Sequence, residues 1–415
     1  MTDTLSNTRT HTFSNGLVLI SEHVSGVQSL AMRCLLPAGA VFEDIHNLGA
    51  SSVCAEMLMR GAGDRDSRQQ ADAFDRAGAL RDVDNAIRFM QISTTTLAHR
   101  VDETLPLVLD MVLRPRLAPE SFLPAQELAL QAVASLADDP QHRAALAARD
   151  RHLPQPYNRS TYGTTEGIAS LTHEKLCAWW NGLVKPAGSL IAVAGDVDHD
   201  QIVEHITAAT RDWNGETSMP TESGTPPRGY AHLDDESNQV QIIIVHDAPP
   251  QAHIDNPFER LAIAVLSGGM SGRLFTEVRE KRGLCYAVSS AYRADKDRGV
   301  VTNYVGTTPE RAQESLDVLH NELHRINAGD VTREELTRAK TGLKSRLIFA
   351  GESTKARASA VAADYFNLGR VRSLEEIVAQ LDAISLDELN GYLRRRDLGT
   401  LTIQTLGPDA LTPPA

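Results

Sequence analysis

The sequence has few cysteines and no long apolar stretch. Cys34, Cys54, Cys177 and Cys285 are far apart and form no CxxC pair, so neither a disulfide framework nor a cysteine zinc site is indicated. No apolar run approaches the length needed to cross a bilayer, and the N-terminal MTDTLSNTRTHTF lacks the apolar core of a signal peptide. We therefore expect free, buried thiols and a cytoplasmic protein that does not enter a membrane.

The chain also lacks an excess of basic residues. Its formal net charge is −13, whereas nucleic acids and anionic membranes select proteins with basic patches. We therefore expect neither as a partner. Apolar residues make up 42% of the chain and charged residues 23%, a balance typical of soluble globular proteins. A length of 415 residues predicts more than one domain.

A linker divides the chain into two halves. The segment NGETSMPTESGTPPR, from Asn214 to Arg228, is rich in Gly, Pro, Ser and Thr and has almost no apolar residues. The order of strands and helices predicted before it recurs after it, although few residues are identical. This pattern predicts an N-terminal domain over 1–215, a linker over 216–229 and a C-terminal domain over 230–415.

Local patterns predict the elements of each half. An Asn-Gly turn precedes a strand from Leu17 to Ser21, and we expect this strand to pair with a second one from Ser29 to Leu36. A helix is predicted over 48–60, and another is predicted from Ser67, with Ser67 as its cap. Further predicted elements are a strand over 86–96, helices over 101–113, 119–136 and 172–184, strands over 189–194 and 240–246, and helices beginning at 198, 258, 309, 332, 373 and 385.

The most informative stretch runs from Leu266 to Ser290 and reads LSGGMSGRLFTEVREKRGLCYAVSS. Its first part contains three glycines among small residues, so the backbone can adopt left-handed turns and approach another chain closely. The next part has the apolar spacing of a helix that ends at Gly283, and a strand follows it. Arg279 and Tyr286 can therefore converge at the corner between helix and strand, as two donors to a carbonyl or an oxyanion. Alternatively, Arg279 pairs with a carboxylate, and Tyr286 is an ordinary strand aromatic.

This stretch resembles the segment of the pitrilysin/insulinase-type zinc peptidases that supplies their arginine/tyrosine pair. Two further passages resemble the same family, and the likeness covers nearly the whole chain. These passages are NGLVLISEHVSGVQSLAMRCLLPAGAVFED and YGTTEGIASLTHEKLCAWWNGLVKPAGSLIAVAGDVD. The resemblance implies an α+β fold of two similar domains, each a largely antiparallel sheet layered with helices. It also implies that the glycine loop, with Gly268, Gly269 and Ser271, binds substrate at the rim of a chamber.

The family's zinc motif, HxxEH followed by a distant glutamate, is absent. One helix face normally supplies two histidine ligands and the glutamate that activates water. At the matching positions this sequence has Ser52, Ala55 and Glu56, and Gln131 takes the place of the third ligand, or Ala132 if the register shifts by one. A serine, an amide and one carboxylate do not hold Zn²⁺ against water. We therefore predict no metal and no cofactor in this chain.

Two other features permit alternative interpretations. His320 and His324 lie four residues apart on a predicted helix and could bind a metal, although helix surfaces often carry histidines. Glu56 is either a solvated remnant of the motif or the partner of a basic residue.

Some members of the family consist of two chains, one with HxxEH and zinc and one with only the arginine/tyrosine pair. This sequence resembles the second kind. The resemblance therefore implies a substrate-binding subunit without catalytic activity of its own. In this hypothesis Arg279 and Tyr286 act on peptides within a heterodimer, whose HxxEH-bearing partner holds the zinc ion. The alternatives are a structural protein of the same fold without a role in proteolysis, and an active peptidase with unusual metal ligands.

Overall fold

The computed structural model describes residues 7–414. Residues 1–6, on which part of the prediction about a signal peptide rests, lie outside the described residues. The chain forms two compact units. The first unit contains the chain up to Ser135 together with Gln155–Ser223 and Ala350–Tyr365. The second unit contains Leu136–Pro154, Gly224–Phe349 and the chain from Phe366. Each unit thus includes a segment from the other half of the sequence, and the division into domains 1–215 and 230–415 stays a prediction.

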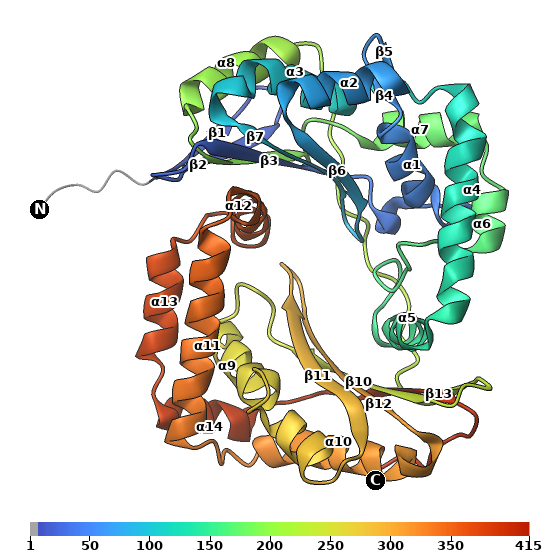
Figure 1. Cartoon of the computed structure of the whole chain (residues 1–415), viewed down its shortest axis with the longest axis vertical. Helices are drawn as coiled ribbons and strands as arrows, with labels where there is room; N and C mark the ends of the chain where they lie inside the picture. The colour runs from blue at the N-terminus through green and yellow to red at the C-terminus, as the bar shows by residue number, and fades with distance from the viewer. Residues whose placement is uncertain (1–6, 415) are drawn as a thin grey trace, which may run out of the picture. The chain divides into compact units, whose positions relative to one another are not determined.

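The first unit is built on a six-stranded sheet with the order β1-β2-β8-β3-β7-β6 (Figure 1). Its strands are β1 (Thr8–Thr12), β2 (Val18–His23), β3 (Ser29–Leu36), β6 (Leu80–Asn85), β7 (Met90–Leu97) and β8 (Leu190–Gly195). All neighbouring strands are antiparallel except β2 and β8. The predicted pairing of the first two apolar strands is wrong, because β8 lies between β2 and β3. Every residue of β8 is buried, and a strand buried on both faces belongs in the middle of a sheet.

Helices cover the first sheet. Their bounds are α1 (Ala50–Leu58), α2 (Ser67–Ala77), α3 (Val101–Leu113), α4 (Pro119–Ser135), α6 (Thr165–Ala169), α7 (His173–Leu183), α8 (His199–Ala209) and α12 (Thr354–Leu368). The helices predicted from 172 and 198 are confirmed, and the side chains of Thr172 and Asp198 cap them. The predicted cap Ser67 is wrong, because Asp66 accepts the hydrogen bond from the backbone of Gln69.

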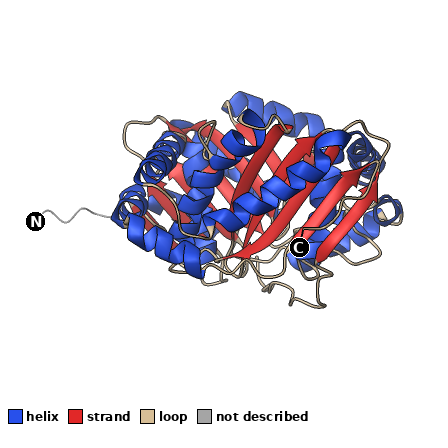
Figure 2. Ribbon diagram, turned by 90° about the horizontal axis from the view of Figure 1, so that it is seen from below, coloured by secondary structure: helices blue, strands red, loops and turns tan. Residues whose placement is uncertain are grey.

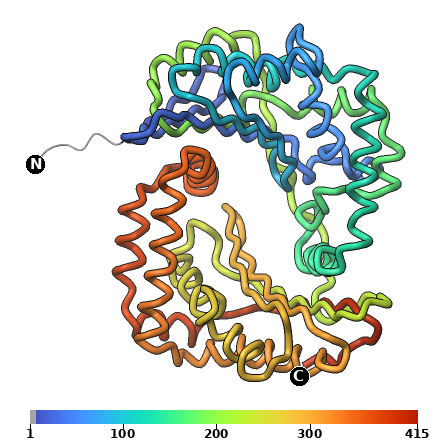
Figure 3. Tube along the Cα trace, viewed as in Figure 1, coloured from blue at the N-terminus to red at the C-terminus, as the bar shows by residue number. Residues whose placement is uncertain are grey.

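The second unit is built on a five-stranded sheet with the order β11-β12-β10-β13-β9. Its strands are β9 (Gly229–Asp234), β10 (Val240–Ala248), β11 (Cys285–Ala294), β12 (Gly299–Thr307) and β13 (Thr402–Gly407). The trace of β11 and β12 runs as a hairpin along one edge of this sheet (Figure 3). Its helices are α5 (Pro140–His152), α9 (Asn256–Ser267), α10 (Ala312–Ile326), α11 (Arg333–Gly351), α13 (Leu374–Ala383) and α14 (Leu386–Arg395).

The two sheets share one topology. Without β1, the first sheet reads β2-β8-β3-β7-β6, and the second reads β9-β13-β10-β12-β11. When the five strands of each sheet are numbered in chain order, their spatial order in both sheets is first, fifth, second, fourth, third. In both sheets the pair formed by the first and fifth strands is the parallel one. The predicted α+β fold of two similar, largely antiparallel domains is confirmed.

Each central strand is buried on both faces. In β10, Ile242 and Ile244 pack into the main core of the unit with α9, α10 and α14, whereas Ile243 and Val245 pack against α5. In the first unit, Ala31 of β3 packs against α12 in the same way. Figure 2 shows this layering of helices (blue) on strands (red). This burial explains why β10 contains the continuous apolar run Ile242–Val245, whereas β3 is interrupted by the partly exposed Arg33.

Candidate functional site

The glycine loop of the second unit follows the end of α9. A Cβ atom on Gly268 would lie 2.2 Å from the carbonyl oxygen of Ala264, and Gly269 has a φ of +149°. Glycine is therefore required at both positions, as the sequence predicts. The loop residues from Gly268 to Ser271 are exposed to solvent.

The helix after the loop is a π-helical turn from Phe275 to Glu280 rather than the predicted regular α-helix. The backbone N–H of Lys281 donates to the carbonyl of Thr276, five residues earlier. Gly283 then ends the turn in a left-handed conformation (φ +63°), as predicted. The guanidinium of Arg279 lies over the ring of Phe275, 4.9 Å from its centroid. In residues 7–414 it has no hydrogen bond or ion pair, so the alternative pairing with a carboxylate does not occur there.

Tyr286 is the extra residue of a β-bulge. Cys285 pairs with Thr307 and Ala287 pairs with Gly306, so Tyr286 has no residue opposite it on β12. Tyr286 is 47% exposed, and its hydroxyl donates only a long hydrogen bond of 3.4 Å to the carbonyl of Thr307. Its exposure is also that of a half-buried strand aromatic, so the alternative interpretation stays open, and the bulge is the feature that distinguishes Tyr286 from a regular strand residue.

Two side chains close to Arg279 and Tyr286 have raised pKa values. Burial raises the pKa of the Cys285 thiol to about 11, and the nearby positive charge of Arg279 opposes this rise. Burial also raises the pKa of Tyr304 to about 12, and Tyr286 and Asp139 add to the effect. Arg279 thus acts on the residue directly before Tyr286 in the chain.

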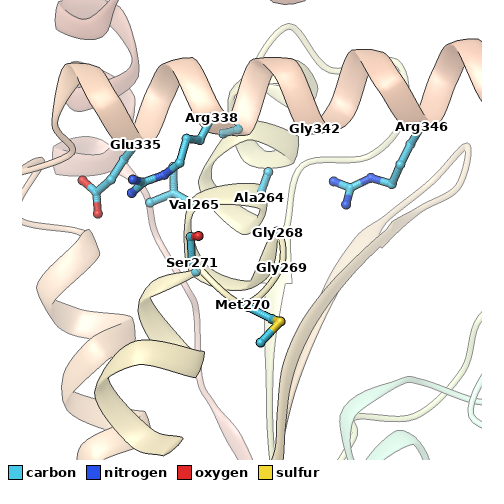
Figure 4. Close-up of a pocket in the computed structure, with 12 residues that line it drawn as sticks. Ala264, Val265, Gly268, Gly269, Met270, Ser271, Glu335, Arg338, Gly342 and Arg346 are labelled. Atoms are coloured by element: carbon cyan, nitrogen blue, oxygen red, sulfur yellow. The ribbon is translucent and has the colours of Figure 1, made fainter. Parts of the chain in front are cut away.

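A pocket of about 160 Å³ separates the glycine loop from α11. Figure 4 shows its lining, which includes the predicted Gly268, Gly269 and Ser271. Its other wall is formed by residues of α11 that sequence reasoning missed, namely Glu335, Arg338, Ala339, Gly342 and Arg346. Their helical spacing is a signal in the sequence, but nothing local links it to a loop about 70 residues earlier. Arg279 and Tyr286 do not line this pocket.

A buried ion pair fixes the loop against α11. Arg273 donates from Nε to Glu335 at 2.7 Å and from Nη1 to Asp330, also at 2.7 Å. Burial alone would raise the pKa of Glu335, but hydrogen bonds and charge from Arg273 outweigh it and hold this pKa at about 2. Glu335 is therefore a committed anion, and its charge is neutralised by Arg273.

The first unit contains the helix that matches the zinc motif. Glu43 caps α1, since its carboxylate accepts hydrogen bonds from the backbone N–H groups of Gly49 and Ser51. At the motif positions Ala55 is buried, whereas Ser52 and Glu56 are partly exposed. A hydroxyl, a methyl group and one carboxylate do not form a zinc site.

The third position is better assigned to Ala132 than to Gln131. The buried residues of α4, which packs against α1, are Phe122, Ala125 and Ala129. Ala132 continues this face at helical spacing, whereas Gln131 is exposed on the opposite side. The alternative register of the sequence comparison therefore agrees better with the structure.

No other cluster resembles a metal centre. Within residues 7–414, no three His, Cys, Asp or Glu side chains are placed to hold a metal ion. The Nε2 atoms of His320 and His324 lie 3.0 Å apart, but a third ligand is missing there. Across the same residues, no helix is both long and apolar enough to span a bilayer.

Comparisons with known proteins agree with this fold. Residues 170–343 match the family model described as the peptidase M16 inactive domain. An uncharacterized zinc protease of Rickettsia felis is 25% identical over 406 residues, which cover 96% of this chain and 97% of the relative. A similarly named protein of Mycobacterium leprae is 27% identical, with 96% and 91% covered.

Two solved structures have the same fold. The crystal structure described as a peptidase M16 inactive domain from Pseudomonas fluorescens aligns with a TM-score of 0.86 at 20% identity, over 98% of this chain and all of that one. A protease from Helicobacter pylori aligns with a TM-score of 0.86 at 18% identity, over 97% of this chain and all of that one. The M16 match thus covers residues 170–343, whereas the likeness over nearly the whole chain is to proteins named as zinc proteases and to the fold of the two solved structures.

Proposed function

We propose that this chain is the non-catalytic, substrate-binding subunit of a two-chain zinc endopeptidase. It supplies Arg279 and Tyr286 to the active site of a homologous partner that bears HxxEH. The absence of the HxxEH motif at Ser52, Ala55 and Glu56 supports the non-catalytic role, and the match of residues 170–343 to the peptidase M16 inactive domain supports the relationship to peptidases. In this complex the partner would hold the zinc ion and provide the hydrolytic centre.

One observation carries the proposal: Arg279 and Tyr286 both occupy irregular backbone and both have exposed side chains. Arg279 lies in a π-helical turn and Tyr286 in a β-bulge. Such irregularities disrupt regular hydrogen bonding and recur at functional sites, where they change the direction of a side chain. A scaffold protein has no use for two exposed donors that are oriented in this way.

The chemistry of these donors suits peptide hydrolysis. When water attacks a peptide carbonyl, negative charge develops on its oxygen, and preorganised donors stabilise this charge in the transition state. The phenol of Tyr286 can donate one hydrogen bond to that oxygen. The permanently charged, planar guanidinium of Arg279 can hold a substrate carbonyl before the reaction begins. The exposed backbone at Gly268, Gly269 and Ser271 would contact the peptide on the same unit.

The test begins with a pull-down from cells of the source organism, which should recover a chain of similar length that contains HxxEH. The reconstituted pair is then assayed for steady-state peptide hydrolysis. Tyr286→Phe should lower kcat by about 10²-fold to 10³-fold, with assembly unchanged in size-exclusion chromatography. Tyr304→Phe is the matched control, because this neighbouring hydroxyl is already bound to Gln241 at 2.8 Å. Arg279→Ala should also raise KM.

Two outcomes would contradict the proposal. If no HxxEH-bearing chain copurifies, the chain does not act as a subunit of such a peptidase. If the Tyr286 and Arg279 variants assemble and hydrolyse peptides at the wild-type rate, the pair is not catalytic. The alternative of a structural protein without a role in proteolysis then becomes the better account.

A further inference from the structure

We propose that the pocket between the glycine loop and α11 binds a carboxylate group of the peptide, with Arg346 as the residue that recognises it. This inference rests on the proposed function in one respect, namely that the chain binds peptides. It adds the chemical class of the substrate, an acidic peptide, and a residue that determines specificity.

The arrangement of α11 supports this assignment. Arg338, Gly342 and Arg346 follow one another at intervals of four residues, so they lie along one face of the helix. All three line the pocket, and Figure 4 shows both arginine side chains extending from α11 on the side of the glycine loop. A ligand in the pocket would thus lie between the exposed loop backbone and two guanidinium groups.

The charges around the pocket leave Arg346 available. Glu335 is the acidic residue of the lining, but both of its carboxylate oxygens accept hydrogen bonds from Arg273. Arg338 pairs with Glu334 at 2.7 Å, and both side chains are exposed, so this pair contributes little and can exchange partners. Arg346 has no hydrogen bond or ion pair with any of residues 7–414. Its charge is therefore free to bind an anion from outside.

The space in the pocket fits a small acidic group. A cavity of about 160 Å³ is far larger than the roughly 10–15 Å³ that a single water molecule requires. Gly342 borders open space, since a Cβ atom at this position would have no neighbour within 4 Å. Glycine destabilises the interior of a helix relative to alanine. Packing does not require a glycine at position 342, so a lack of room does not explain why this residue is present.

A carboxylate is the anion that a peptide carries. Guanidinium groups bind carboxylates through two parallel hydrogen bonds. The carboxylate could belong to an Asp or Glu side chain or to the C-terminus of the peptide. Both sources offer the same group to Arg346, and peptide variants can distinguish between them.

The experiment measures binding by the full isolated chain, without a partner, by fluorescence anisotropy. The probes are labelled synthetic peptides that contain acidic residues, so their choice does not depend on hydrolysis by a reconstituted pair. Each is made with Glu or Gln at its acidic positions and with a free or amidated C-terminus. The wild-type chain should bind either the Glu form or the free-acid form more tightly than its neutral counterpart. Arg346→Gln should lower the affinity for the preferred form by about tenfold and so remove the preference. Gly342→Leu should do the same by filling the pocket without changing any charge.

Arg333→Gln is the matched control, because it removes the same charge from the same helix outside the pocket. It should leave the preference intact. Equal binding of charged and neutral peptides by the wild-type chain, an equal effect of the Arg333 and Arg346 variants, or no binding at all would overturn the proposal. These outcomes are independent of catalysis. A charge preference that depends on Arg346 would stand even if the Tyr286 and Arg279 variants left turnover unchanged. That unchanged turnover would contradict the proposed function but not the assignment of the pocket.

Discussion

Arg273 should be the main link between the glycine loop and α11, and its loss should destabilise the second unit. Its side chain is 9% exposed and contacts Glu335, which is 17% exposed, and Asp330, which is 42% exposed. Removing one partner of a fully buried pair costs about 3–5 kcal/mol, because the other charge stays buried without compensation. Water can reach Asp330 but hardly Glu335, so we expect Arg273→Met to cost about 3 kcal/mol, at the lower end of this range.

Unfolding in urea is monitored by hydrogen exchange of individual peptides, because a chain of two units need not unfold in one step. Arg273→Met should lower the midpoint for peptides from residues 268–274 and from α11, and leave the first unit unchanged. Arg9→Met is the control, since Arg9 forms a two-fold hydrogen-bonded pair with Asp200 that is exposed to solvent. The reasoning is refuted if both variants have equal effects, or if exchange in α11 does not change.

The same ion pair should make the second unit sensitive to acid. The pKa of Glu335 is about 2 in the folded chain, below the value of about 4.3 in an unfolded chain. Its stabilisation is therefore complete above about pH 4.3 and is lost as the pH falls towards 2. After allowance for solvent screening, about 1–2 kcal/mol should be lost. Glu335→Gln should remove this part of the pH dependence in unfolding experiments at pH 6 and pH 3.

Three further predictions concern other regions. Glu259→Gln should cost about 3 kcal/mol in urea unfolding, because its fully buried carboxylate pairs with the buried Arg396; a loss below about 1 kcal/mol would contradict this. The purified chain should contain no stoichiometric zinc by elemental analysis, and one tightly held ion per chain would refute that expectation. Two variants with a restored zinc motif are compared, one that also carries Ala132→Glu and one that also carries Gln131→Glu. The first should bind zinc more tightly, as measured by competition with a chromogenic chelator. The restored motif in both variants consists of Ser52→His, Ala55→Glu and Glu56→His.

The sequence predicted those parts of the fold that depend on neighbouring residues. Thr172 and Asp198 cap their helices as expected, because a cap is a contact over two or three residues. Ser373 and Ser385 do the same in the second unit. The order of strands was not predictable in this way. The insertion of β8 between β2 and β3 joins segments about 160 residues apart, and no local pattern encodes such a contact.

In the candidate site, too, the sequence predicted the features that depend on local backbone and not those that depend on distant contacts. The glycine loop was recognisable because Gly268 and Gly269 are required by their own backbone. The opposite wall of the pocket, with Arg338, Gly342 and Arg346, could not be assigned to the site from the sequence. Its position depends on the tertiary ion pair of Arg273 with Glu335, which links residues 62 positions apart.

The direction of Tyr286 shows why the sequence alone could not resolve the arginine/tyrosine pair. In a regular strand, neighbouring side chains point to opposite faces, so a buried Cys285 would place Tyr286 and Ala287 on different sides. The observed burial breaks this alternation, since Cys285 is buried while Tyr286 and Ala287 are both exposed. The bulge thus keeps Ala287 out of the core and leaves Tyr286 without a residue opposite it on β12, which alternation alone does not predict. Arg279 likewise depends on the wider π-helical turn. Because both donors depend on departures from regular geometry, periodic patterns in the sequence locate these two residues but do not indicate where their side chains point.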